Sequence, residues 1–339
     1  MDPLQHSSAA SVVRDVRFSE QTGKFTVVSR NLMGQTENAD EGFDYCVCAT
    51  GHFSTPNMPH FPGFETYSGR LLHAHDFRDA LDFKDKDILV IGTSYSAEDI
   101  ASQCYKYGVK SVTLSWRTAP MGFNWPSNFT TVPLLKNVEG KICHFIDGTS
   151  KDVDAIILCT GYLHHFPFLP DKLRLQTSNR MYPANLWKGV MWCDNPKMFY
   201  IGMQDQWYTF NMFDAQAWFV RDVMMGRITA PSKEEQIKDN EEWRAREDKL
   251  EGDEQKICFQ GDYVKMLISA TDYPSFDIDA VNKMFFDWEH AKHEDIMKFR
   301  DVRHRSVITG DMSAAYPTTW LQEHDDTLEN YLRKSGVMV

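Results

Sequence analysis

The chain has 339 residues, a formal net charge of −12 at neutral pH and an apolar content of 42%. This length is generous for one domain and sufficient for two, with room for a ligand cleft. The acidic balance excludes partners that are recognised through a surplus of Lys and Arg, such as nucleic acid or an anionic membrane surface. We therefore expect a small-molecule ligand, with no nucleic-acid and no membrane partner.

The cysteines and the N-terminus bear on the compartment. Seven Cys lie mostly in apolar runs, without the paired C-x2-C spacing of zinc sites, and Cys46 and Cys48 are interpreted as buried structural thiols. Residues 1–10 lack the basic and apolar regions of a secretory signal. No apolar run reaches the roughly 18 residues that a membrane span requires. These features predict a reduced, cytoplasmic chain.

The first predicted elements are two strands, residues 12–18 and 24–29, joined by a turn at residues 21–23 to form an antiparallel hairpin. Strict alternation along the first strand would place Val12 and Val16 on the same face. The hairpin is therefore expected to bury one face of that strand.

Two later apolar runs share one pattern. The run at residues 43–48 is followed by Thr50 and Gly51, and the run at residues 153–159 is followed by Thr160 and Gly161. An Asp precedes the Thr at the same spacing in both runs. We interpret this repeat as one structural device used twice.

Between the repeats, the pattern predicts a βαβ unit. It consists of a strand at residues 87–91, a turn at 92–94, a helix through 99–107 and a strand at 111–116. Parallel strands connected in this way form a doubly wound sheet, which binds ligands at the carboxyl ends of its strands.

The layout is that of an inserted dinucleotide domain. We place this domain at residues 60–161, between parts of a second domain at 1–59 and 162–339. In the last part we expect a strand at 198–201 and, after a loop, a helix at 210–225. The dense charges of residues 233–256 are interpreted as a solvated helical face.

The turn of the βαβ unit fits G-x-S-x-x-A, a relaxed dinucleotide fingerprint. Gly92 permits the tight turn, Ser94 is small enough for a pyrophosphate to approach, and Ala97 allows close helix packing. The helix N-terminus offers N–H groups to the anion. A plain strand-to-helix turn is the alternative, whereas a hydrolase elbow is excluded because position 96 is Ser rather than Gly.

The next strand ends in Arg117 and Thr118. An NAD-binding fold places an acidic residue here, whereas an Arg accommodates the 2′-phosphate of NADP(H). The residues therefore favour NADP(H), with an ordinary surface Arg as the alternative.

A segment upstream carries a family resemblance. Tyr67, Gly69, His73 and Phe77 resemble the F-x-G-x-x-x-H-x-x-x-[YF] signature of flavin-containing monooxygenases, with Tyr67 replacing the first Phe. Nearly the whole chain is similar to the bacterial trimethylamine monooxygenase subgroup. The resemblance implies an α/β fold of two dinucleotide-binding, Rossmann-like domains, in which the NADPH domain is inserted into the FAD domain. It also implies an FAD-fingerprint G-x-G-x-x-G, which nothing before Gly51 fits, so we expect most of that first unit to be missing.

The resemblance implies a chemistry that FAD carries out. NADPH reduces the flavin, O2 adds to form a C4a-hydroperoxide, and a tertiary amine such as trimethylamine takes up one oxygen atom. By resemblance the residues that contact the cofactors are Gly92, Ser94, Tyr95, Ser96, Arg117, Thr118, Gln206, Thr50, Gly51, Thr160 and Gly161. Tyr95 and Trp207 are the predicted catalytic residues. The faces of Tyr95, Trp207 and Trp288 are the candidates for holding the amine, although packing alone explains Trp288 equally well.

Other interpretations stay open. His73 and His75 have an H-x-H spacing, but no third metal ligand is positioned nearby, so we predict no metal site. Oxygenation at sulfur or of a ketone is a sibling activity, and a catalytically incompetent NADP-binding remnant is the alternative from another class. A homodimer is expected only by analogy with the family.

Overall fold

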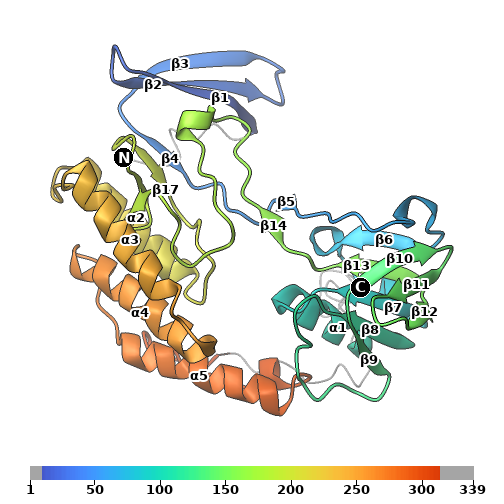
Figure 1. Ribbon diagram of the computed structural model, residues 1–339. Coiled ribbons are helices and arrows are strands. Elements are labelled where there is room, and N and C mark those ends of the chain that lie inside the picture. The colour runs from blue at the N-terminus through green and yellow to red at the C-terminus, as the bar shows by residue number, and fades with distance from the viewer. Residues whose placement is uncertain (1–9, 314–339) are drawn as a thin grey trace, which may run out of the picture. The chain divides into compact units, whose positions relative to one another are not determined.

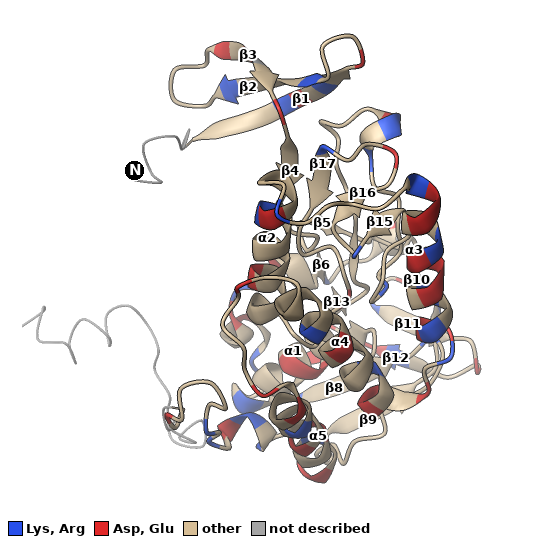
Figure 2. Ribbon diagram, turned by 90° about the vertical axis from the view of Figure 1, so that its left-hand side faces the viewer, with Lys and Arg blue, Asp and Glu red and all other residues tan. Residues whose placement is uncertain are grey.

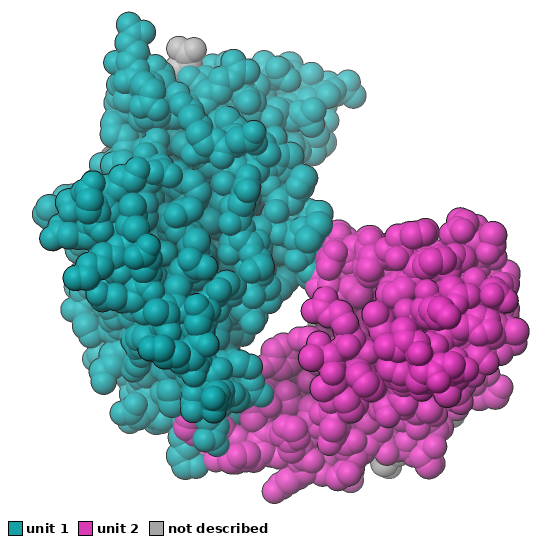
Figure 3. Space-filling model, viewed as in Figure 1, with its two compact units in different colours: residues 1–55, 162–285 teal, residues 56–161, 286–339 magenta. Residues whose placement is uncertain are grey.

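The structure is a computed structural model that describes residues 10–313. It divides into two compact units, which are coloured separately in Figure 3. Unit 1 combines residues 1–55 with 162–285, and unit 2 combines residues 56–161 with 286–339. Residues 1–9 and 314–339 lie outside the described part.

Unit 2 is built on a parallel five-stranded sheet, as the βαβ pattern predicts (Figure 1). Its order is β6 (Arg70–His73), β13 (Ala155–Leu158), β7 (Asp87–Ile91), β8 (Ser111–Ser115) and β9 (Phe129–Val132). Helix α1 (Tyr95–Lys106) connects β7 to β8. It begins four residues before the predicted helical range, directly after Ser94.

Both faces of this sheet are buried, because side chains alternate along each strand. Ile88 and Val90 of β7 pack in one core cluster with residues of α1. Leu89 and Ile91 pack in another, against an antiparallel sheet. That sheet contains β10 (Leu135–Glu139), β11 (Ile142–Phe145) and β12 (Ser150–Asp152). Because α1 covers one face of the sheet and the β10–β12 sheet covers the other, β7 is an almost continuous apolar run. The same packing holds the carboxyl ends of the strands in place.

Unit 1 begins with the predicted hairpin, β1 (Ser11–Ser19) and β2 (Lys24–Asn31), and β3 (Glu37–Phe43) extends it to three strands. The expected common face of Val12 and Val16 is wrong. The pairing register shifts between Val13 and Asp15, so one extra residue bulges from β1. Val16 is consequently buried while Val12 is exposed.

The apolar run at residues 43–48 does not form one strand, because the chain changes sheets after Phe43. β4 (Cys46–Cys48) pairs in parallel with β17 (Met198–Tyr200) at the edge of a separate four-stranded sheet. The other strands of that sheet are β15 (Leu186–Trp187) and β16 (Met191–Trp192). All seven cysteines fall within the described residues, and all are free thiols.

The remaining elements are mainly helical. The remaining helices are α2 (Phe210–Met224), α3 (Lys233–Glu247), α4 (Gly252–Ser269) and α5 (Ile278–Glu294). Two short strands, β5 (Thr55–Pro56) and β14 (Tyr162–Leu163), pair with each other. The 3-10 segments are Phe64–Thr66, Ala74–Asp76, Ala80–Phe83, Asp171–Leu173 and Phe299–Asp301. Figure 2 shows acidic and basic residues side by side along α3, which explains the charged stretch in the sequence. Within residues 10–313, no helix has both the length and the apolar character needed to cross a bilayer.

Candidate functional site

Gly92 forms the turn between β7 and α1. Its backbone φ is +134°, which favours glycine, and its N–H donates to the carbonyl of Ser115 at 3.0 Å. A Cβ placed here would lie 2.1 Å from the carbonyl oxygen of Cys159. Only glycine therefore lets the turn lie so close to the end of β13.

The N-terminus of α1 follows this turn. Ser94 is extended and its carbonyl accepts from the N–H groups of Ala97 and Glu98, at 2.8 and 3.1 Å. Among the described residues, the Ser94 side chain makes no capping hydrogen bond. Ser94 and Ser96 are exposed, whereas Ala97 is fully buried. Oriented N–H groups at an exposed helix start fit a phosphate.

Arg117 and Thr118 lie on the same edge of the sheet. β7 pairs with β8 so that Ile91 is opposite Ser115, and both strands therefore end together. Arg117 follows two residues after β8 and is exposed with Thr118. A guanidinium at the same sheet edge as an exposed helix N-terminus is the donor set that a phosphorylated dinucleotide requires, so these residues fit NADP(H).

Thr160 and Gly161 follow β13 and leave the sheet at the same edge, since Leu158 is opposite Ile91. The Thr160 hydroxyl donates to the carbonyl of Asn57 at 2.6 Å, and the Asn57 N–H donates to the carbonyl of Gly161 at 2.9 Å. Burial lowers the pKa of the signature residue His73, and a hydrogen bond with the Gly161 backbone opposes this shift. These contacts hold the crossover segment in place.

Tyr95 and Trp288, two of the predicted aromatic residues, lie together in unit 2. Their ring centroids are 6.0 Å apart at 48°. The ammonium of Lys292 lies 4.9 Å from the Tyr95 ring and 5.2 Å from the Trp288 ring. Both rings thus already contact a cation that belongs to the chain.

Gln206 and Trp207 belong to unit 1, in the loop before α2. The Gln206 Oε1 atom is buried and has no hydrogen-bond partner in the part of the chain that the structure describes. A buried acceptor of this kind fits a ligand that offers an N–H donor, as the flavin ring does. The Trp207 ring packs edge-on against Phe285, with centroids 6.1 Å apart.

Buried amides that the sequence analysis missed hold this loop. Gln260 accepts from the N–H groups of Trp207 and Tyr208, at 2.6 and 2.8 Å. Gln216 accepts from the Gly202 N–H at 2.8 Å and donates to the Gln204 side chain at 3.0 Å. Isolated Gln residues on α2 and α4 carry no motif, so no pattern in the sequence marks them.

A pair of histidines supports the start of the same loop. Thr50 and Gly51 are exposed, but the next residue, His52, is buried and donates from Nδ1 to the Gly202 carbonyl at 2.8 Å. His164 donates from Nε2 to the Met203 carbonyl at 3.0 Å, and the two rings stack at 5.1 Å. Burial lowers the pKa of both imidazoles.

The predicted site residues therefore fall into two groups. Unit 2 holds, at one edge of its sheet or beside α1, the residues Gly92, Ser94, Tyr95, Ser96, Arg117, Thr118, Thr160, Gly161 and Trp288. Unit 1 holds Thr50, Gly51, Gln206 and Trp207.

Comparison with known proteins gives consistent matches. The model of a family described as "Flavin-binding monooxygenase-like" matches residues 3–124 and 129–291. The trimethylamine monooxygenase of Roseovarius sp. strain 217 is 59% identical over 319 residues, which are 94% of this chain and 72% of that protein. The trimethylamine monooxygenase of Methylocella silvestris is 55% identical over 95% of this chain and 71% of its own length.

A solved structure matches as well. The crystal structure of Tmm from Pelagibacter sp. strain HTCC7211 aligns with a TM-score of 0.90 at 46% sequence identity. The alignment covers 95% of this chain and 72% of that one.

Proposed function

The chain belongs to the flavin-binding monooxygenase-like family, and from this premise we propose that it is an FAD- and NADPH-dependent N-oxygenase of tertiary amines. The proposed reaction transfers one oxygen atom of O2 to the nitrogen of trimethylamine, which gives trimethylamine N-oxide, while the hydride of NADPH and a proton reduce the other oxygen atom to water and leave NADP+. The observation that carries the proposal is the edge of the unit 2 sheet, where Gly92, the start of α1 and Arg117 provide the donors for NADPH.

Each residue at this edge has a proposed task. The backbone at Gly92 and Ser94 lets the pyrophosphate approach, and the N–H groups at Tyr95 and Ser96 orient it. Arg117 binds the 2′-phosphate, with the Thr118 hydroxyl beside it. Because these groups are held by a sheet that is buried on both faces, they are positioned before the ligand arrives.

The proposed flavin contacts lie in unit 1. The buried Oε1 of Gln206 accepts from the flavin, while Gln260 holds the neighbouring backbone in place. Thr50 and Gly51 are proposed to border the cofactor where the chain leaves β4. When bound, FAD supplies the activation of O2, and NADPH supplies the hydride. The chain's own part is to orient both cofactors and exclude water from the reacting atoms.

The proposed amine contacts are aromatic. A trimethylammonium-like group binds to ring faces, and Tyr95, Trp207 and Trp288 are the candidates. Tyr95 is 37% exposed, so its ring is accessible although one face meets Lys292. We propose Tyr95 and Trp207 as the residues that border the reacting atoms.

A direct assay tests this proposal. The purified chain is incubated with FAD, NADPH, 18O2 and trimethylamine, and the product is analysed by mass spectrometry. We expect NADPH consumption that depends on the amine and one labelled oxygen in the N-oxide. Dimethyl sulfide and cyclohexanone, offered in parallel, should react more slowly. A flavin-bearing chain that prefers either of them would contradict the amine assignment, and a chain that stays colourless after incubation with FAD would contradict flavin use.

The free thiols support a cytoplasmic location as part of the proposal, because an oxidising compartment favours disulfides.

The homodimer expected from the family is proposed on that resemblance alone. Light scattering of the purified chain at two concentrations distinguishes a dimer from a monomer.

A further inference from the structure

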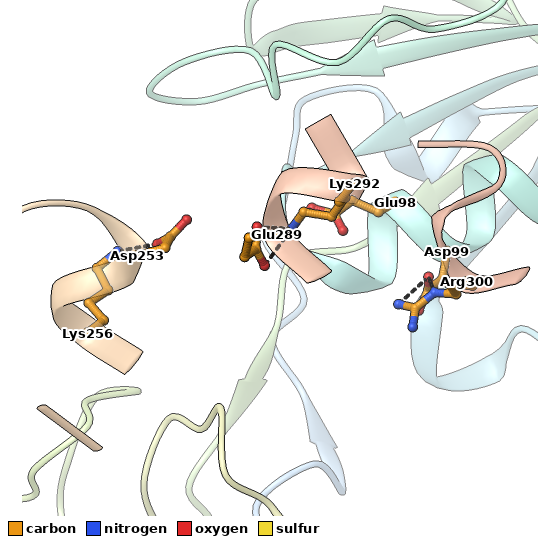
Figure 4. Close-up of polar contacts among 7 residues, drawn as sticks. All are labelled: Glu98, Asp99, Asp253, Lys256, Glu289, Lys292 and Arg300. Carbon is orange, nitrogen blue, oxygen red and sulfur yellow. Dashed lines mark hydrogen bonds and ion pairs between the residues drawn. The ribbon is translucent and has the colours of Figure 1, made fainter. Parts of the chain in front are cut away.

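Unit 2 contains a buried lysine that the proposed reaction does not use. Lys292, on α5, is only 5% exposed, and Glu98 and Glu289 are similarly buried. The Lys292 ammonium lies 3.4 Å from Glu98 Oε1 and 2.9 Å from Glu289 Oε2. Figure 4 shows Lys292 between the two carboxylates. Buried charges are expensive to maintain, so this arrangement needs an explanation beyond an ordinary surface pair.

Three aromatic rings complete the surroundings of this ammonium. Its Nζ lies 4.9 Å from the centroid of Tyr95, 5.5 Å from that of Phe123 and 5.2 Å from that of Trp288. At these distances a cation attracts the faces of all three rings. The ammonium therefore restrains Tyr95 and Phe123 relative to each other.

The two restrained rings belong to the two sides of the proposed nucleotide site. Tyr95 is the first residue of α1 and directly follows the turn at Gly92. Phe123 lies in the segment that follows Arg117 and β8. Lys292 thus contacts both the segment that begins at Gly92 and the segment that follows Arg117.

A second ion pair also joins α1 to the C-terminal part of unit 2. Arg300 donates to Asp99 through Nε and Nη2, at 2.8 and 3.0 Å, as Figure 4 also shows. Its guanidinium lies 5.6 Å from the Trp288 ring centroid. Consecutive residues of α1, Glu98 and Asp99, are therefore both bound by basic residues from the C-terminal part of unit 2.

We propose that Lys292 is a positioning residue for the nicotinamide nucleotide, which sets the affinity for NADP(H) through Tyr95 and Phe123. The ammonium is too buried to contact the nucleotide itself. The proposal rests on the proposed function, because it requires a nucleotide at residues 92–118. A purely structural salt bridge would differ in one respect: its loss would lower stability and leave the affinity of the folded protein unchanged.

The variants are chosen to separate these two roles. Lys292→Met removes the cation, and the double variant Lys292→Met/Glu289→Gln also removes a carboxylate that would otherwise remain buried without its partner. Lys292→Arg keeps a cation among the rings of Tyr95, Phe123 and Trp288. Lys256→Met is the matched control, because Lys256 forms an i,i+3 pair with Asp253 on α4 that is solvent-exposed (Figure 4).

The measurement is calorimetric titration of each variant of the 339-residue chain with NADP+, at a temperature where circular dichroism shows it folded. We expect Lys292→Met and the double variant to bind about tenfold more weakly, and Lys292→Arg to stay within about threefold of the wild type. Lys256→Met should bind like the wild type. In a Tyr95→Leu background, Lys292→Met should weaken binding little further, because the ring that transmits the effect is gone.

The inference would be overturned if folded Lys292→Met and the folded double variant Lys292→Met/Glu289→Gln both bound NADP+ with unchanged affinity. Full additivity with Tyr95→Leu would overturn it too, since Lys292 would then act independently of that ring. Arg117→Ala separates this failure from that of the proposed function. If Arg117→Ala weakens NADP+ binding and Lys292→Met does not, only the inference fails; if the wild type does not bind NADP+, the proposed function fails.

Discussion

Gly92 shows how one residue type fixes the nucleotide turn. Its positive φ and the close approach of the Cys159 carbonyl are two separate demands, and glycine alone meets both. Gly148 makes a useful comparison, because it has a φ of +87° and no described atom lies within 4 Å of its would-be Cβ. The two glycines share backbone strain but differ in contact.

We therefore predict that Gly92→Ala destabilises the protein by about 2–4 kcal/mol, because the new methyl collides with backbone that cannot move cheaply. Gly148→Ala should cost only about 1 kcal/mol, for the backbone conformation alone. Urea denaturation followed by circular dichroism measures both changes. Equal losses in the two variants would show that the contact with Cys159 has no role.

Single residues can be predicted from the sequence where the local backbone or packing leaves space for only a small side chain. Gly92 and Ala97 were predicted to sit in tight turns or tight packing, and the structure confirms both. Lys292 was missed, because 194 residues separate it from Glu98 and no local pattern distinguishes it from Lys283, the other lysine of α5. Contacts between distant parts of a chain leave no spacing to recognise.

Among the elements, the parallel strands were the most predictable. The range of β7 was predicted to the residue because burial on both faces demands an unbroken apolar run. The run at residues 43–48 does not correspond to one element, because it spans the point where the chain leaves β3 for β4. A change of sheet is a tertiary event, and composition does not record it.

His52 and His164 join the segments after β4 and before α2 into one supporting element, and their burial predicts a pH effect. Their folded-state pKa values lie below the ordinary 6.5, so the unfolded chain takes up protons first as the pH falls. Their contribution to stability is complete above pH 6.5 and is lost as the pH drops toward the folded pKa. Each can cost up to about 1.4 kcal/mol per pH unit in this window.

The double variant His52→Gln/His164→Gln tests this prediction, because Gln still offers an N–H donor but does not titrate. Urea denaturation at about pH 7.5 and about pH 5.5 should show a smaller loss of stability for the variant than for the wild type. His60→Gln, at an exposed position, serves as the control. A wild-type loss that persists in the double variant would assign the pH effect to other groups.

For the whole molecule, the resemblance to the monooxygenase family correctly predicts two Rossmann-like domains, one inserted into the other. The division of the chain is more complex than the repeats suggest, because residues 286–313 join unit 2 although they follow the second part of unit 1. Ion pairs to Glu98 and Asp99 make that attachment. The attachment of residues 286–313 to unit 2 depends on side chains that are far apart in the sequence. Hydrophobic periodicity, which is a local pattern, could therefore not predict this attachment.

Residues 92–118 are proposed to bind a nucleotide carrying a 2′-phosphate, and calorimetric titration with NADP+ and NAD+ tests this binding most directly. We predict that NADP+ binds about tenfold to hundredfold more tightly than NAD+. Arg117→Ala should abolish this preference, whereas Arg30→Ala, an exposed arginine on β2, should preserve it. Absence of NADP+ binding, or a preference that survives Arg117→Ala, would contradict the account.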